Sequence, residues 1–330
     1  MRVQNLFSRV LLAAVISSAC TSTAFATLFN GTLYYTTYNG GQNVWNINYN
    51  YDDSTHAFGL GSANNIASTN GADGIIFAPN GNLLIGGQGS GNVYEVKPSD
   101  GSVVNTQFTG NASFHMALNP NGTKAYTSNF GGSLNTLSLP IGSGSTNQAI
   151  SGGDSGVTQI AFGDGGTVFY VDGSPNGFGN LGTIDLSTGA TTRLYSSVQP
   201  AHGLIYDPFT DLMTMFGAGQ TGTMSALDGS GLLASGSIFG VGDFDQGAVD
   251  GKGHALVAGS NSITFIDYSL SNDITKPDYT ASIGGFAFID DVAPLSGSGS
   301  NPQGNVPEPT TLALLGAGLV GGFRASRRHK

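Results

Sequence analysis

The chain has 330 residues, of which 39% are hydrophobic and 10% are charged, so it is long enough to bury a sizeable core in one large domain. Its formal net charge is −10, and between residues 27 and 306 only five Lys and Arg stand against 20 Asp and Glu. Such an acidic body argues against partners that are nucleic acids or anionic membrane surfaces. The only cysteine is Cys20, so the chain beyond it has no disulfide and no thiolate metal site.

The N-terminal segment has the features of a secretory signal peptide. A basic start precedes an apolar run at residues 10–16, which is too short to span a bilayer, and Ala24 and Ala26 then supply the small residues that a signal peptidase reads. We therefore expect a signal helix in residues 1–26, with cleavage after Ala26. The alternative, lipoprotein cleavage before Cys20, lacks the usual aliphatic residue three positions earlier.

The middle of the chain is a repeat. Each copy has an apolar strand, a tight turn such as Pro-Asn-Gly or Asp-Gly, and a second apolar strand, and several copies add a third strand. The copies begin at residues 73, 115, 159, 202, 245 and 290, which are 42 to 45 residues apart. A period of about 40–45 residues with this content predicts a β-propeller with four strands in each blade.

The first and last parts of the repeat region are incomplete and complement each other. Two strands between residues 32 and 48 lack an inner strand, whereas the last copy, at 289–295, has only an inner strand. One blade built from both parts would remove the exposed sheet edges. The sequence therefore predicts an all-β fold, a six-bladed β-propeller over residues 27–295, whose first blade is shared between 31–66 and 286–295.

The repeat resembles the NHL-type, gluconolactonase-like and streptogramin-lyase-like propellers. The similarity lies in phrases such as those starting at Asp73 and His202, and it covers most of residues 70–260. These phrases are structural repeats and not an active-site motif, so the resemblance implies the fold far more than a function.

The starts of the innermost strands should ring one mouth of the central channel. The residues at these positions are Asp73, His115, Gln159, His202, Asp245 and either Asp290 or Asp291. Such a ring could hold Ca²⁺ or Mg²⁺, with Asp73, Asp245 and Asp290 as metal ligands, or could perform acid–base catalysis. The register leaves His115 beside Gly74, and a shift of one residue would turn its side chain to the other face of the strand. The alternative is that these polar groups only cap the channel.

Other polar and aromatic groups have plainer explanations. Asp52 and Asp53, and likewise Asp243 with Asp245, are short acidic pairs that lack the further ligands of a calcium loop, and the glycine-rich run 86–91 reads as a hairpin. Tyrosines and the single tryptophan crowd the first blade, where they either stack on sugars or pack between blades. They are Tyr34, Tyr35, Tyr38, Trp45, Tyr49 and Tyr51.

The C-terminal segment follows a flexible polar linker at 296–306. It combines a Pro-Glu-Pro, an apolar stretch at 310–323 and a basic end. As a helix, this stretch of 14 residues spans about 21 Å, against a hydrocarbon core of about 30 Å, so the short hydrophobic helix should be a transient membrane insertion. A simple membrane anchor is the alternative.

This segment, residues 307–330, closely resembles the PEP-CTERM sorting signal of Gram-negative bacteria. In that family a membrane-embedded exosortase recognises the tail and cuts it, and the organisms form exopolysaccharide-rich biofilms. The resemblance implies recognition and stop residues at Pro307, Glu308, Pro309, Arg324, Arg327 and Arg328.

We therefore expect an exported protein that the secretion machinery and an exosortase place at the cell envelope, and then at the cell surface or outside the cell. The absence of a recognisable catalytic motif favours a non-enzymatic surface or extracellular-matrix propeller, which would bind exopolysaccharide, surface proteins or another ligand. The alternative is an extracytoplasmic metal-dependent lyase or lactonase with its site at the channel mouth. In that case the catalytic residues would be His115, His202, Asp73 and Asp245.

Overall fold

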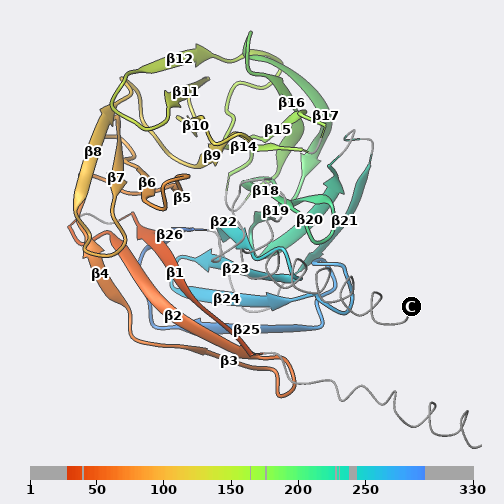
Figure 1. Ribbon diagram of the computed structural model, residues 1–330. Coiled ribbons are helices and arrows are strands. Elements are labelled where there is room, and N and C mark those ends of the chain that lie inside the picture. Colours follow the sequence, from red (N-terminus) through yellow and green to blue (C-terminus); the bar gives the residue numbers. More distant parts are fainter. Residues whose placement is uncertain are drawn as a thin grey trace, which may run out of the picture.

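The computed structural model describes residues 28–38, 41–163, 165–174, 177–226, 229, 231–237 and 244–293. The described residues form strands and connecting turns, arranged as six sheets around a central axis (Figure 1). The expected all-β, six-bladed β-propeller is thus confirmed. The expected signal helix and C-terminal helix lie outside the described residues, and no helix in the described ranges is long and apolar enough to cross a membrane.

The first three blades run along the chain from the N-terminal side. Blade 1 contains β26 (Ile289–Val292), β1 (Leu28–Thr37), β2 (Val44–Asp52) and β3 (Ala57–Leu60), with β4 (Asn64–Ala67) also paired to β2. Blade 2 contains β5 (Ile75–Phe77), β6 (Leu83–Gly86), β7 (Asn92–Val96) and β8 (Val103–Phe108). Blade 3 contains β9 (Met116–Leu118), β10 (Lys124–Ser128), β11 (Ser133–Ser138) and β12 (Ser145–Ala149).

The other three blades complete the ring. Blade 4 contains β14 (Gln159–Phe162), β15 (Val168–Val171), β16 (Gly179–Asp185) and β17 (Ala190–Val198), and the short β13 (Ser151–Gly152) pairs with β17 in parallel. Blade 5 contains β18 (Gly203–Asp207), β19 (Leu212–Gly217), β20 (Gln220–Ser225) and β21 (Leu232–Ser237). Blade 6 contains β22 (Phe244–Val249), β23 (His254–Gly259), β24 (Ser262–Asp267) and β25 (Tyr279–Gly284).

The ring closes as the two incomplete repeats predicted. The strand β26 pairs antiparallel with β1, so blade 1 takes its innermost strand from the C-terminal end of the propeller and its other strands from the N-terminal end. Ile289 and Val292 of β26 are buried in a cluster that also contains Leu256 and Phe265 of blade 6. The closing strand therefore joins blade 1 to blade 6 through packing as well as through the sheet.

Six apolar clusters fill the six interfaces between neighbouring blades in the described part of the chain. Side chains along a strand point alternately to its two faces, so each strand contributes to the clusters on both sides of its blade. Ile75 of β5 packs toward blade 1, whereas the next residue, Ile76, packs toward blade 3. Because both faces of the inner strands are buried, these strands appear in the sequence as continuous apolar runs.

Glycines occupy the tight turns that the repeat predicted. Gly81 and Gly122, in the two Pro-Asn-Gly turns, have φ values of +84° and +67°, which a residue with a Cβ rarely adopts. Gly101 turns into the outer strand of blade 2, and a Cβ there would lie 1.6 Å from the carbonyl oxygen of Ile66 in blade 1. The glycines thus serve both turn geometry and the close approach of neighbouring blades.

The closing strand provides a test of the ring. Val292 is fully buried, so we expect Val292→Asp to lower the free energy of unfolding by about 3 kcal/mol or more, because a charge would lie in the apolar cluster of blades 1 and 6. Urea unfolding followed by circular dichroism measures this change. Leu270→Asp is the matched control, because Leu270 is 84% exposed and its replacement should leave stability nearly unchanged. Equal stability of the two variants would contradict closure through β26.

Candidate functional site

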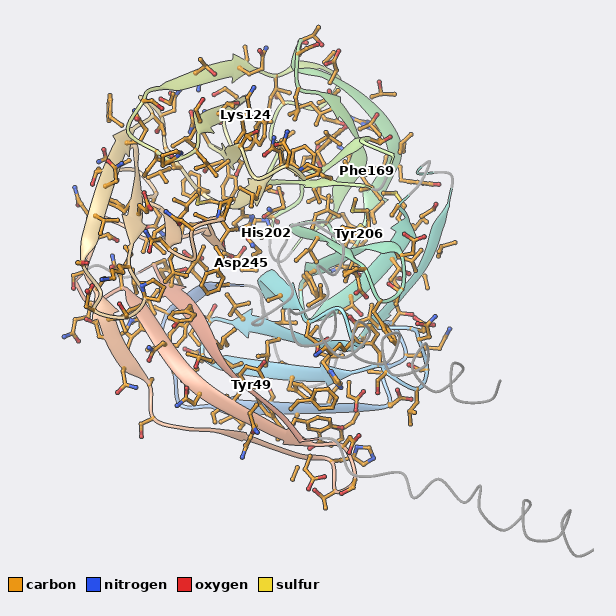
Figure 2. The ribbon with its side chains drawn as sticks, viewed as in Figure 1. Tyr49, Lys124, Phe169, His202, Tyr206 and Asp245 are labelled. Carbon is orange, nitrogen blue, oxygen red and sulfur yellow. The ribbon has the colours of Figure 1, made fainter. Side chains whose placement is uncertain are left out.

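The polar residues at the starts of the innermost strands meet at one mouth of the channel. Asp73 and His115 lie just before β5 and β9, His202 lies just before β18, and Asp245 is the second residue of β22. In Figure 2, His202 and Asp245 lie near the centre of the ring, although they come from different blades. The register question for His115 is resolved: the residue precedes β9, where strand alternation does not apply, and its side chain joins the others.

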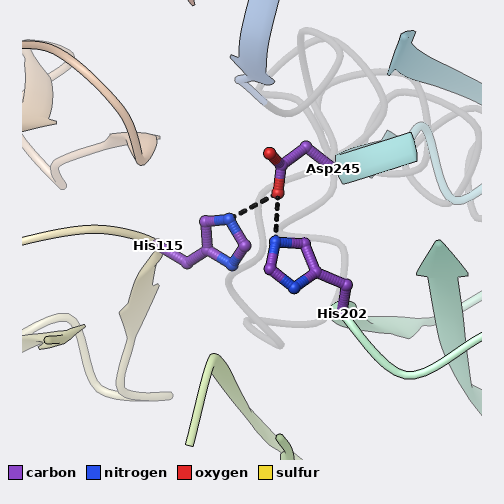
Figure 3. A group of neighbouring side chains, drawn as sticks. All are labelled: His115, His202 and Asp245. Atoms are coloured by element: carbon purple, nitrogen blue, oxygen red, sulfur yellow. Dashed lines mark ion pairs between the residues drawn. The ribbon is translucent and has the colours of Figure 1, made fainter. Parts of the chain in front are cut away.

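His115, His202 and Asp245 form the tightest group (Figure 3). The Nε2 atom of His115 lies 2.6 Å from Oδ1 of Asp245, and the Nε2 atom of His202 lies 2.9 Å from the same oxygen. The two imidazole rings are 4.7 Å apart and nearly perpendicular. Both imidazoles are almost wholly buried, whereas the Asp245 side chain is 20% exposed. One carboxylate oxygen, Oδ1 of Asp245, is therefore shared by two imidazoles and is itself buried, while the rest of the Asp245 side chain forms the accessible side of the group.

A second group shares His115 with the first. One ligand atom from each of Asp73, His115 and Asp291 lies within 4.8 Å of the others, as do those of the first group. Asp290 is connected to Asp73 through Gln88, whose amide nitrogen is 3.4 Å from Oδ2 of Asp73 and 3.2 Å from Oδ2 of Asp290. Four buried or partly buried carboxyl groups and two imidazoles thus occupy one small volume. We call these six residues, Asp73, His115, His202, Asp245, Asp290 and Asp291, the mouth cluster.

The backbone fixes the tautomer of His202. Its Nδ1 atom lies 2.6 Å from the carbonyl oxygen of Gly173, and because a carbonyl only accepts, Nδ1 carries a proton. In a neutral His202 the Nε2 atom is then a bare lone pair that faces the carboxylate of Asp245. Two acceptors at 2.9 Å repel each other unless a proton lies between them or both bind one cation. The Asp245 Oδ1 atom also makes no aligned hydrogen bond with a described residue.

Burial and mutual repulsion shift the titration of the carboxyl groups. Burial, and then the neighbouring carboxyl groups, raise the pKa of Asp73, Asp290 and Asp291 well above the ordinary range. Burial would also raise the pKa of Asp245, but the charges of His115 and His202 outweigh it and lower that pKa. For His115, burial lowers the pKa, but the charge of Asp245, the hydrogen bond to it and the charge of Asp73 together outweigh burial, so the net shift is upward.

Surrounding residues hold the cluster in place. The Phe130 ring packs against both imidazoles, with its centre 5.3 Å from His115 and 5.7 Å from His202. Thr158 donates its hydroxyl to the carbonyl of His202 at 3.0 Å, and Thr36 donates its hydroxyl to the carbonyl of Asp73 at 2.5 Å. The backbone N–H of Gln246 donates to Oδ1 of Asp291. These contacts orient the side chains before any ligand arrives.

Sequence reasoning missed two contributors to the site, Gln88 and Phe130. Both lie in the turn between the second and third strands of a blade, where they have positive φ values of 50° and 54°. The glycine-rich run around Gln88 does form the expected hairpin, but its glutamine reaches the cluster. The signal available in the sequence was the equivalent position of the two residues in consecutive repeats.

Other expected residues lie elsewhere or are not described. The Gln159 side-chain amide donates to the backbone carbonyl of Met116, so it is used within the ring wall. Asp52 accepts hydrogen bonds from Ser54 in an exposed hairpin. Asp243 lies outside the described residues, as do the expected cleavage and sorting residues, which are Ala24, Ala26, Pro307, Glu308, Pro309, Arg324, Arg327 and Arg328.

Comparison with known proteins identifies the C-terminal segment. The model of the PEP-CTERM protein-sorting motif matches residues 305–328, as the sequence predicted. The motif marks the chain as an exported protein that exosortase processes at the cell envelope. No curated protein matches the chain in sequence.

Solved structures similar to the chain are β-propellers. A nidogen/laminin complex has a TM-score of 0.59 at 12% identity, covering 80% of this chain and 98% of that chain. A streptogramin B lyase has a TM-score of 0.52 at 11% identity, covering 83% and 93%. A 6-phosphogluconolactonase, described as putative, from Bacteroides fragilis has a TM-score of 0.52 at 13% identity, covering 81% and 84%. At these identities the similarity establishes the fold alone.

The raised pKa values predict an unusual pH dependence. Because Asp73, Asp290, Asp291 and His115 hold protons more tightly in the folded state, the folded chain binds more protons than the unfolded chain above about pH 4. We therefore expect stability in the presence of a chelator to fall as the pH rises from about 5 to about 8. Thermal unfolding across this range measures it.

Asp291→Asn provides the matched test of this pH dependence. It removes one buried charge while keeping an oxygen for the Gln246 N–H, so it should raise the free energy of unfolding at pH 8 by about 1–3 kcal/mol and flatten the pH profile. The control is Asp100→Asn, because exposed Asp100 has a pKa lowered to about 2, by hydrogen bonds from Ser102 and then Lys97, and its contribution is lost only in acid. A wild-type profile in Asp291→Asn would contradict the assignment.

Proposed function

We propose that the protein is an exported, exosortase-sorted propeller of the cell surface or extracellular matrix, and that it binds a divalent cation at its mouth cluster. The observation that carries the proposal is the meeting of His115, His202 and Asp245 from three blades on one oxygen atom. A structural cap of the channel requires polar groups at the mouth, but it does not require two imidazole nitrogens and a carboxylate to converge.

The charge of the mouth cluster also supports a cation as the ligand. The mouth cluster holds four carboxyl groups and two imidazoles, so with its carboxyl groups ionised it stays negative even when both imidazoles are protonated. Burial of unpaired negative charge is strongly unfavourable, and a bound cation removes that cost. A cation bound by both Nε2 of His202 and Oδ1 of Asp245 would also resolve the contact of two acceptors.

The two ligand groups suit different cations. His115, His202 and Asp245 offer two nitrogens and one oxygen, which favours Zn²⁺, Fe²⁺ or Ni²⁺. Asp73, His115 and Asp291 offer two carboxylates and one imidazole, which favours Mg²⁺ or Mn²⁺. Because this second group is rich in oxygen ligands, Ca²⁺ and Mg²⁺, the cations expected from the ring of carboxylates, are also to be tested.

A metal-dependent lyase or lactonase is the second candidate, favoured by the number of ligands in the first group. Three protein ligands leave coordination positions open, as in catalytic centres, and the partly exposed Asp245 lies on the accessible side. The cation would supply Lewis-acid polarisation of a carbonyl or of water. His115, His202, Asp73 and Asp245 would hold the cation and orient the substrate. Cation-dependent turnover of a lactone, lost in His202→Ala, separates this candidate from a purely binding role.

The cation proposal predicts a ligand-dependent gain in stability. Addition of Zn²⁺, Mn²⁺, Mg²⁺ or Ca²⁺ to chelator-treated protein should raise the melting temperature, because a cation at 100 times its dissociation constant stabilises the folded state by about 2.7 kcal/mol. The gain should vanish in Asp245→Asn and in His202→Ala. Differential scanning fluorimetry with each cation measures it.

His56→Ala is the control for this experiment. It removes an exposed histidine outside the mouth cluster, so the cation effect should remain at the wild-type size. If none of the four cations moves the melting temperature, or if Asp245→Asn responds like wild type, the cation centre is wrong. The export and sorting part of the proposal would then remain, since it depends on a different segment.

The sorting segment has its own test. Deletion of residues 307–330 should move the protein from its processed surface or extracellular location, because the exosortase would have no motif to recognise. Fractionation with immunodetection of the propeller measures the location. Replacement of residues 296–304, which precede the matched motif, by a Gly-Ser segment of equal length is the control and should leave sorting unchanged. An unchanged location after the deletion would contradict the sorting role.

A further inference from the structure

A cleft of about 400 Å³ lies beside the mouth cluster and is lined by aromatic groups. It is formed where β1 ends, where β2 begins, and by the segment that leads from β25 to the closing strand β26. Its lining residues are Tyr35, Thr37, Gln42, Trp45, Ala63, Gly285, Phe286, Ala287 and Phe288. This volume falls within the range of about 300–1,000 Å³ that is usual for small-molecule sites.

The cleft is tied to the mouth cluster through the chain. Thr36, between two lining residues, bonds the backbone oxygen atoms of Asp73 and Asp291. Phe288 is followed two residues later by Asp290 of the cluster. A ligand in the cleft would thus lie on the same face of the propeller as the candidate cation centre.

The aromatic rings are arranged partly for the core and partly for contact with a ligand. Tyr35 is buried, and its ring is stacked on Trp45 at an interplanar angle of 6° with centres 6.3 Å apart, while Trp45 itself stays only partly buried. Tyr38, which follows the lining residue Thr37, packs edge to face on the lining residue Phe288, and the two are 45% and 42% exposed. Large aromatic rings left open to solvent beside a cleft indicate a binding surface more than a folding requirement.

Phe288 is held in a conformation that is unfavourable for a bulky residue. Its φ is +61°, and its carbonyl accepts the N–H of Tyr38 at 3.0 Å, while the next residue, Ile289, donates its N–H to Ser260. Backbone strain of this kind persists where the surrounding contacts enforce it, and it concentrates at functional sites. Here it directs an exposed ring to the rim of the cleft.

The chemistry of the lining selects the ligand class. No lining residue carries a charge. The polar side-chain groups are the hydroxyls of Thr37 and Tyr35, the exposed amide of Gln42 and the indole N–H of Trp45, which donates to the carbonyl of Gln42. A ligand that matches uncharged aromatic faces and a few hydrogen-bonding groups has an apolar face and hydroxyl groups, which describes a sugar ring. The acidic body of the propeller repels polyanions and therefore favours a neutral saccharide.

We infer that this aromatic cleft binds a neutral saccharide, with Trp45, Tyr38 and Phe288 packing against the sugar ring and Gln42 and Thr37 bonding its hydroxyl groups. The inference goes beyond the cation centre and does not depend on it. It gives the surface propeller a second ligand, carried by a separate set of residues on the same face.

The single tryptophan makes the test direct, because Trp45 is the only one in the chain and it lines the cleft. Full-length protein is titrated with neutral hexasaccharides of β-linked glucose, α-linked glucose and mannose, and with an acidic oligogalacturonate. At least one neutral saccharide should change Trp45 fluorescence with a saturable curve, and the acidic probe should not. Absence of a saturable change with all three neutral probes, or stronger binding of the acidic probe, would overturn the inference.

Variants locate the binding. Phe288→Ala and Tyr38→Ala should each raise the dissociation constant about tenfold, because each removes one good aromatic contact. Phe178→Ala is the matched control, because Phe178 is 66% exposed in blade 4 and does not line the cleft. Wild-type affinity in both cleft variants overturns the inference. Titration in the presence of a chelator should give the same affinity, so a failed cation centre leaves this result standing, whereas loss of binding under chelation assigns the sugar to the mouth cluster instead.

Discussion

The pairing of β26 with β1 is the interaction on which the rest of the molecule depends. It closes the ring and covers the edge that β1 would otherwise expose. It also brings Asp290 and Asp291 beside Asp73, His115 and Asp245, which come from blades far away in the sequence. The segment that leads into β26 then forms one wall of the aromatic cleft. A propeller that failed to close would therefore lose both candidate sites together with the core between blades 1 and 6.

Closure has an electrostatic consequence. It adds two buried carboxyl groups to a mouth that already holds Asp73 and Asp245, and the two imidazoles compensate only part of that charge. The apolar clusters between the blades must supply the stability that this repulsion removes, unless protons or a cation neutralise it. The chain contains no disulfide that could help, since its only cysteine precedes the propeller. The empty mouth cluster therefore stabilises the fold least when its carboxyl groups are ionised, which is the cost that the proposed cation would offset.

Much of the fold could be predicted from the sequence because the same pattern of strands and turns recurs from blade to blade. Each innermost strand recurs at nearly the same spacing, with turn residues at the same offset, and the two incomplete repeats complement each other. The ring positions could be predicted for the same reason, since the starts of parallel inner strands meet at one mouth. Gln88 and Phe130 were not predicted as part of the site. Both lie in turns between the second and third strands, where the two-residue alternation that orients strand side chains does not apply. The aromatic cleft was not predicted, because Tyr38 packs against Phe288, which is 250 residues further along the chain.

The order of the chain connects these sites with delivery of the protein. The closing strand is the last strand of the propeller, so the mouth cluster and the cleft can form only after residue 293 is available. The sorting motif begins at residue 305, after a polar linker. A propeller that has not yet closed therefore has neither site, whereas a closed one carries both sites a dozen residues ahead of the motif. Because a Gly- and Ser-rich segment separates the motif from β26, removal of the motif need not disturb the β26 pairing that holds both sites together.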